Sequence, residues 1–278
     1  MSAMEYVAAP FNIPVGFAIE LQKAGELLDV GNRAQEIGQA VLEEMQTSEI
    51  DSDYKFVGFF ILNKALKSLQ SVQVLCRCGY GSDGFSICAV LFENLIDLLF
   101  IGHAPVKQAR RFCQFESVEK YYQIQKVLAA KRLPKGRRAK YKEYEKRLLP
   151  DVLPLLKYFP KRSKGWSQTS LLDRAKRVKA ALDYQELYWI FCAHKHTLPF
   201  VAPGISIQTA AGNLAFTNGP DMKGICYASE QSAELFLKIC LVLAREFNLS
   251  TRTEIESCLV AIQNAVRSVR IHHPELFK

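Results

Sequence analysis

The chain has 278 residues, of which 49% are hydrophobic and 23% charged, and its formal net charge is +8. This composition excludes an intrinsically disordered chain, because enough apolar surface is present to offset the entropy that folding costs. The length is sufficient for one large domain, and we predict a single helical domain over residues 1–278.

Apolar residues recur at helical spacing along most of the chain, whereas alternating β-branched runs typical of strands are nearly absent. We therefore predict an all-α protein, an irregular bundle of about nine helices. The helix over 85–102 is apolar on nearly every side, which indicates a central position. The predicted helices cover residues 15–45, 54–76, 85–102, 105–131, 137–149, 170–182, 184–196, 229–247 and 251–271.

Capping residues and breaks separate these helices. Asp51-Ser52-Asp53 is a helix start, and Ser167 or Thr169 is a candidate N-cap for the helix over 170–182. Residues 197–223 form a long loop, whose part 197–220 has no charged residue and contains several prolines and glycines. That run cannot form a membrane-spanning helix, and we expect no membrane partner.

Positive charge is concentrated between residues 107 and 179. This segment holds 22 Lys or Arg and 6 Asp or Glu, whereas the rest of the chain has 14 basic and 22 acidic residues. We predict that residues 105–160 form a basic helical protrusion. A basic face attracts phosphate backbones or anionic lipid.

Aromatic residues are interleaved with these basic residues, a combination that can hold single-stranded nucleic acid by charge and stacking. The alternatives are that Trp166 is a hydrophobic plug against the bundle and that the basic helix is a solvated face with Lys–Glu pairs. The candidate nucleic-acid-binding residues are Arg137, Arg138, Lys161, Arg162, Lys164, Trp166 and Arg177.

The predicted helix over 184–196 ends in His194 and His196. The helix dipole stabilises an imidazolium at a helix C-terminus and raises its pKa, which would suit a general acid acting on a phosphate ester. The alternative is a structural histidine that fixes the loop that follows.

Glu93 and Asp97 lie one turn apart on the most apolar predicted helix. A buried carboxylate costs several kcal/mol unless it is paired, so we expect a histidine, an arginine or a helix N-terminus beside them. A structural pair is the simpler interpretation, and a catalytic role or a metal site is the alternative. We predict that Glu93 meets His196 inside the bundle.

Other site signatures are missing from the sequence. It has no Glu-x-x-His motif, paired C-x-x-C or Ser-His-Asp order, and we expect no metal and no cofactor. Most of the eight cysteines lie in apolar runs, and the N-terminal residues do not resemble a signal peptide. We therefore expect reduced thiols in a cytoplasmic protein.

Residues 80–200 resemble a bacterial all-helical family of unknown function. The resemblance consists of Glu93 on an apolar helix, a W-S-x-x-S loop at Trp166-Ser167 and Ser170, and a Y-x7-H helix at Tyr188 and His196. The family often has an arginine where this chain has Ala89 and a serine where it has Cys192.

This family is distantly similar to HEPN-type helical proteins, many of which are ribonucleases in bacterial defence systems. The resemblance implies a HEPN-like core and a metal-independent ribonuclease or RNA-binding protein in defence or stress. The imidazole of His196 or His194 would act as acid or base, and Glu93 is a further candidate catalytic residue. HEPN nucleases carry an R-x4–6-H motif, but neither His194 nor His196 has an arginine at that distance upstream, so Arg174, or Arg162 or Arg177, would hold the phosphate. The alternative is a non-catalytic helical interaction protein that forms a homodimer.

Overall fold

The computed structural model describes residues 18, 21–47, 49–160, 164–196, 206–208, 214–216 and 224–277. These residues form an all-α helical bundle of about ten helices, apart from one pair of three-residue strands, which confirms the predicted fold class. The HEPN-like form of the core stays a prediction.

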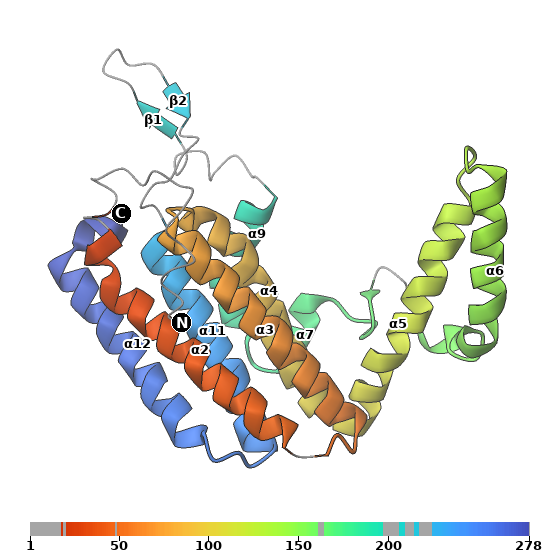
Figure 1. Ribbon diagram of the computed structural model, residues 1–278, viewed down its shortest axis with the longest axis horizontal. Coiled ribbons are helices and arrows are strands. Elements are labelled where there is room, and N and C mark those ends of the chain that lie inside the picture. The colour runs from red at the N-terminus through yellow and green to blue at the C-terminus, as the bar shows by residue number, and fades with distance from the viewer. Residues whose placement is uncertain are drawn as a thin grey trace, which may run out of the picture.

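Within the described residues, five long helices enclose the main core (Figure 1). The central helix α4 packs against α3 on one side and α11 on the other, while α2 and α12 complete the layer around α11. The five helices are α2 (Gly25–Gln46), α3 (Asp53–Arg77), α4 (Gly81–Gly102), α11 (Ile225–Glu246) and α12 (Arg252–His272).

Helix α4 has the central position that its apolar sequence predicts. Leu91, Ile96 and Leu98 have no exposed surface, and burying a side chain of this kind stabilises a fold by about 1.5–3 kcal/mol. Among the described residues, α4 is also the one helix with the length and composition of a membrane span, but 61% of its most apolar window is buried inside the bundle. A central core helix has the same composition.

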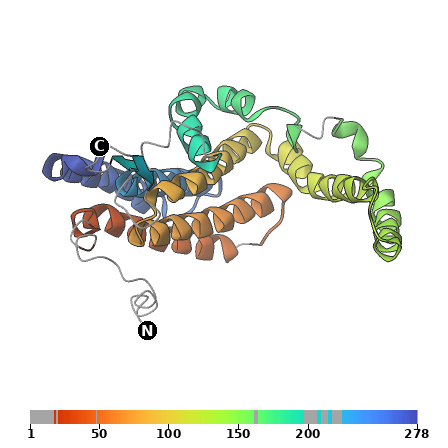
Figure 2. The same ribbon diagram turned by 90° about the horizontal axis from the view of Figure 1, so that it is seen from above.

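Helices α5 (Pro105–Leu128) and α6 (Lys135–Val152) form an antiparallel hairpin that projects from the bundle (Figures 1 and 2). The hairpin has its own small core, in which Val118, Val152 and Phe159 are fully buried. The chain then returns to the bundle through the short 3-10 turn η1 (Leu156–Tyr158).

The returning chain crosses α4 with four short elements. They are α7 (Leu171–Arg177), α8 (Ala181–Asp183), the π-helical turn η3 (Tyr184–Tyr188) and α9 (Trp189–Lys195). The predicted helix over 170–182 therefore ends early, and the one over 184–196 begins with a π-helical turn. Most of the predicted loop over 197–223 lies outside the described residues. Within it, β1 (Ser206–Gln208) pairs antiparallel with β2 (Leu214–Phe216).

Candidate functional site

Asp97 on α4 is the centre of a buried polar cluster. Its Oδ1 lies 2.8 Å from Nε of Arg174 on α7, and its Oδ2 accepts a 3.1 Å hydrogen bond from the indole N–H of Trp166. Burial raises the pKa of Asp97, and the Arg174 guanidinium and the Trp166 N–H oppose that rise. Of the three partners expected for this carboxylate, a histidine, an arginine or a helix N-terminus, the structure shows an arginine.

The W-S-x-x-S motif builds the other half of this cluster. Arg174 donates to Oγ of Ser167 at 2.8 Å and to the carbonyl of Thr169 at 3.1 Å. Ser170 caps α7 by accepting from the backbone N–H of Asp173 at 3.1 Å. The predicted cap at Ser167 or Thr169 is therefore wrong by one to three residues, because Ser167 is held by Arg174. The motif positions a loop and starts a helix.

Trp166 is a plug in this arrangement. Its side chain is 8% exposed, and its ring meets Phe100 and Phe112 edge-on at centroid distances of 5.9 and 5.3 Å. The guanidinium of Arg174 lies 5.8 Å from the ring centre. A ring that is 8% exposed leaves little surface for a nucleic-acid base to stack on, and Arg174 is bound by its own neighbours.

Glu93, one turn before Asp97, has different partners from those we expected. The hydroxyl of Tyr188 donates to its Oε1 at 2.7 Å, and Nζ of Lys195 lies 3.9 Å away. Burial raises the pKa of Tyr188, and hydrogen bonds with Cys192 and Glu93 add to the rise, so the phenol stays protonated. Two residues of the resemblance, Glu93 and Tyr188, thus form a direct bond.

The two histidines lie apart from these carboxylates. His194 is half-buried with its ring 4.8 Å from that of Phe85, and burial lowers its pKa, whereas we had predicted a rise. His196 is exposed at the end of α9. Among the interactions of the described residues, none joins His196 to Glu93, so the structure does not bring the predicted pair together.

The remaining predicted nucleic-acid-binding residues are scattered. Arg138 donates to the carbonyls of Leu128 and Ala130 at 2.7 and 2.9 Å and thereby closes the α5–α6 hairpin. Arg177 lies over the Phe100 ring at 5.7 Å. Arg137, Lys164 and Arg177 are exposed. Lys161 and Arg162 lie outside the described residues.

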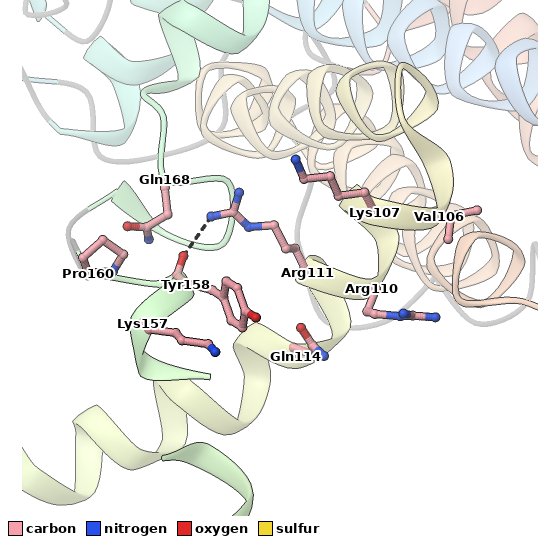
Figure 3. Close-up of a pocket in the computed structure, with 9 residues that line it drawn as sticks. All are labelled: Val106, Lys107, Arg110, Arg111, Gln114, Lys157, Tyr158, Pro160 and Gln168. Atoms are coloured by element: carbon pink, nitrogen blue, oxygen red, sulfur yellow. Dashed lines mark hydrogen bonds between the residues drawn. The ribbon is translucent and has the colours of Figure 1, made fainter. Parts of the chain in front are cut away.

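A groove where the hairpin joins the bundle gathers cationic side chains that we did not select from the sequence (Figure 3). Its volume is about 860 Å³, and of the nine described residues that line it four are Lys or Arg and none is Asp or Glu. The lining consists of Val106, Lys107, Arg110, Arg111, Gln114, Lys157, Tyr158, Pro160 and Gln168. We call this feature the basic groove.

The two walls of the basic groove come from different parts of the chain. Arg111 on α5 reaches across and donates to the carbonyl of Tyr158 at 2.9 Å, as Figure 3 shows, while its guanidinium lies 5.4 Å from the centre of the Phe159 ring. Tyr158 is 52% exposed, and Nζ of Lys157 lies 4.9 Å from its ring centre. Nε of Arg110 lies 3.7 Å from Oδ2 of Asp53, and both side chains are exposed.

Metal binding requires several ligands within a few ångströms of one another. Over the part of the chain that the structure describes, no group of three or more His, Cys, Asp or Glu side chains is placed to hold a metal ion.

The comparison with protein families matches residues 55–202 to a family of unknown function (DUF5677). The chain belongs to this family. The DUF5677 match runs from α3 to the residues that follow α9, and so contains the Asp97 cluster, the hairpin and the basic groove. It confirms the prediction of an uncharacterised domain family. Comparison with curated proteins and with solved structures returned no match.

Proposed function

We propose that this DUF5677 protein binds RNA through the basic groove. The observation that carries the proposal is the lining itself, in which Lys107, Arg110, Arg111 and Lys157 occur without a carboxylate. Cationic side chains around a concave surface attract a phosphate backbone, because several charges act on it together.

The arrangement of these charges supports backbone binding. Arg111 is held in place by its bond to the Tyr158 carbonyl, so it does not have to be ordered when a phosphate arrives. Arg110 has only an exposed and therefore weak pairing with Asp53. Figure 3 shows Lys107 on the α5 wall and Lys157 on the opposite wall, so that a strand in the groove would have cations on both sides.

Binding without cleavage is the form of the proposal that the geometry favours. Metal-independent cleavage needs an imidazole and a phosphate-holding cation at one place. His194 is packed against Phe85, and Arg174 is bound to Asp97, Ser167 and Thr169. Both groups therefore already have structural contacts in the fold.

Fluorescence anisotropy with labelled fragments of cellular RNA, over a range of salt concentrations, tests the proposal. We expect affinity to fall steeply with salt. Combining Lys107→Glu with Lys157→Glu should weaken binding and reduce the slope of log K against log[salt] by about 2, or about 1 for each lost phosphate contact. Lys64→Glu combined with Lys67→Glu, at two exposed positions on α3, is the matched control, because it changes the net charge by the same amount. The proposal is contradicted if wild type does not bind RNA, or if the control loses as much RNA affinity as the test variant.

A cleavage assay separates binding from catalysis. Wild-type protein and His196→Ala are incubated with the same RNA, with and without a chelator. We expect intact RNA in every sample. Cleavage that survives the chelator and disappears in His196→Ala would restore the ribonuclease interpretation.

A homodimeric interaction protein is the second candidate, favoured by an apolar groove of about 710 Å³ between α3 and α5. Phe56 and Phe60 line this groove and are 50% and 46% exposed. An exposed apolar surface of this kind is typical of an interface, and a second copy could cover it across a twofold axis. Light scattering after gel filtration should then give a dimer that Phe60→Glu converts to a monomer. A monomeric wild type would exclude this candidate.

A further inference from the structure

A second cleft lies between α4, α11 and the segment from α7 to η3. Its volume is about 280 Å³, and its floor comes from the main core: Phe92, Leu95 and Ile96 on α4, and Leu235 on α11, all buried. Small-molecule sites in helical proteins are concave, mostly apolar and provided with a few polar groups, and they often lie between helices. This cleft has that character, and 280 Å³ is at the small end of the range.

Lys179, at the rim of this cleft, has a backbone conformation that favours glycine. Its φ is +62°, directly after the C-terminus of α7. Ala180 N–H bonds to the Ala175 carbonyl at 2.8 Å and Lys179 N–H to that of Lys176 at 3.2 Å, the pattern of a Schellman end. Glycine is the usual residue here because a Cβ is strained at positive φ. The chain instead has a lysine whose side chain lines the cleft.

The other charged groups around the cleft largely neutralise one another. Nζ of Lys238 lies 2.7 Å from Glu234, and Arg245 lies 3.4 Å from Glu256 on α12. Asp183 also lines the rim, so that three cations and two carboxylates face the cleft. Among the described residues, Lys179 has no carboxylate within salt-bridge distance. Lys179 is therefore the cation at this cleft that can pair with an anionic group of a ligand.

We propose that this cleft binds a small elongated apolar molecule that ends in an anionic group, the chemistry of a medium-chain carboxylate. The apolar floor takes the chain, and Lys179 takes the carboxylate. Strained residues that persist in a fold are concentrated at ligand sites, which accounts for a lysine where glycine would be more stable. This site is separate from the basic groove, and the two proposals can fail independently.

Calorimetric titration of the full-length protein with decanoate, and with decanol as the uncharged counterpart, tests the inference. Lys179→Gly should lower decanoate affinity by roughly two- to fivefold, because Lys179 is exposed and solvent weakens its pairing with a carboxylate, and it should leave decanol affinity unchanged. Because glycine relieves the positive φ, the same variant should unfold at a higher temperature than wild type. A variant that is more stable yet binds worse cannot owe its defect to misfolding.

Asn248→Gly is the matched control. Asn248 has a φ of +53° at the end of α11, where Leu249 N–H bonds to the Ala244 carbonyl at 2.9 Å. The substitution relieves a strain of the same kind, smaller because asparagine tolerates positive φ better than lysine, and it does not change the cleft. It should raise stability slightly and leave decanoate binding unchanged. Leu99→Gln in the cleft should weaken both ligands. The inference is overturned if wild type does not bind decanoate, or if Lys179→Gly binds it as wild type does.

Discussion

Arg174 connects three parts of the structure at one point. It bonds to Asp97 on α4, to Ser167 and Thr169 in the preceding loop, and lies over the Trp166 ring. The side chains of Arg174 and Asp97 are only 12% and 17% exposed, so solvent screens the pair little. A buried pair of this kind is costly to break, because the remaining partner is left charged and unsatisfied.

Arg174→Ala should therefore destabilise the protein by about 3–5 kcal/mol, measured by urea unfolding. Asp97→Asn should have a smaller effect, because the amide oxygen still accepts from Trp166 and Arg174 keeps its hydrogen bonds to Ser167 and Thr169. The matched control is Arg177→Ala, three residues on, where the guanidinium is exposed and has only a ring contact with Phe100. If both arginine variants are equally stable, the Asp97 pair does not hold the loop.

His194 should make stability sensitive to acid. Burial lowers its pKa in the folded protein, and the nearby Asp83 opposes this effect without reversing it. The unfolded chain therefore binds its proton first as pH falls, and the stability that the neutral ring contributes is lost below the ordinary histidine pKa of about 6.5. The unfolding temperature should fall less between pH 7.5 and pH 5.0 in His194→Phe than in wild type.

The control for this titration is His103→Gln, at an exposed histidine just after α4. In this variant the unfolding temperature should fall by as much as in wild type between pH 7.5 and pH 5.0. If it falls by as much in His194→Phe as in wild type, other groups determine the pH dependence.

At the scale of elements, the N-terminal ends of α4 and α11 approach each other closely. A Cβ at Gly81 would lie 2.4 Å from the backbone nitrogen of Ile225, which cannot move as a side chain can. Gly81→Ala should therefore cost at least about 1–3 kcal/mol in the free energy of unfolding, as overpacking does.

Gly136→Ala is the matched substitution, because Gly136 lies in α6 with nothing within 4 Å of a new Cβ. Alanine favours helix by up to about 1 kcal/mol over glycine, so this variant should be neutral or more stable. Chemical unfolding of both variants gives the comparison. A Gly81→Ala variant as stable as Gly136→Ala would mean that the two helix ends can separate at no cost.

The helices were predictable where their cause is local. The start at Ser52, which accepts from the Lys55 N–H, and the apolar sequence of α4 follow from nearby residues. The π-helical turn at Tyr184–Tyr188 was not predictable, because its last residue contacts a residue that is distant in the sequence. It accompanies the Tyr188 bond to Glu93, 95 positions earlier in the chain. Likewise, the basic groove depends on how η1 returns beside α5, which residue spacing does not encode.

At the scale of the whole molecule, the segment with the excess of positive charge is also the segment that forms the smaller of the two hydrophobic cores. The basic segment contains nearly all of the α5–α6 hairpin and its small core, whereas most of the main core lies in the more acidic remainder. Phe159 belongs to the small core, is fully buried and directly follows Tyr158 in the basic groove. The shape of the basic groove therefore depends on the packing of the hairpin core, whereas the folding of the bundle does not.

Phe159→Ala should accordingly loosen the hairpin and leave the bundle folded. Removing a buried phenylalanine costs about 3–5 kcal/mol, and here that cost falls on a core with only three fully buried members. Hydrogen exchange should show lost protection in α5 and α6 but not in α4 or α11, together with weaker RNA binding. Phe236→Ala, in the main core, should instead lower protection throughout the bundle. If Phe159→Ala exposes α4 and α11 as well, hairpin and bundle unfold as one cooperative unit, and RNA binding could not be changed through the hairpin alone.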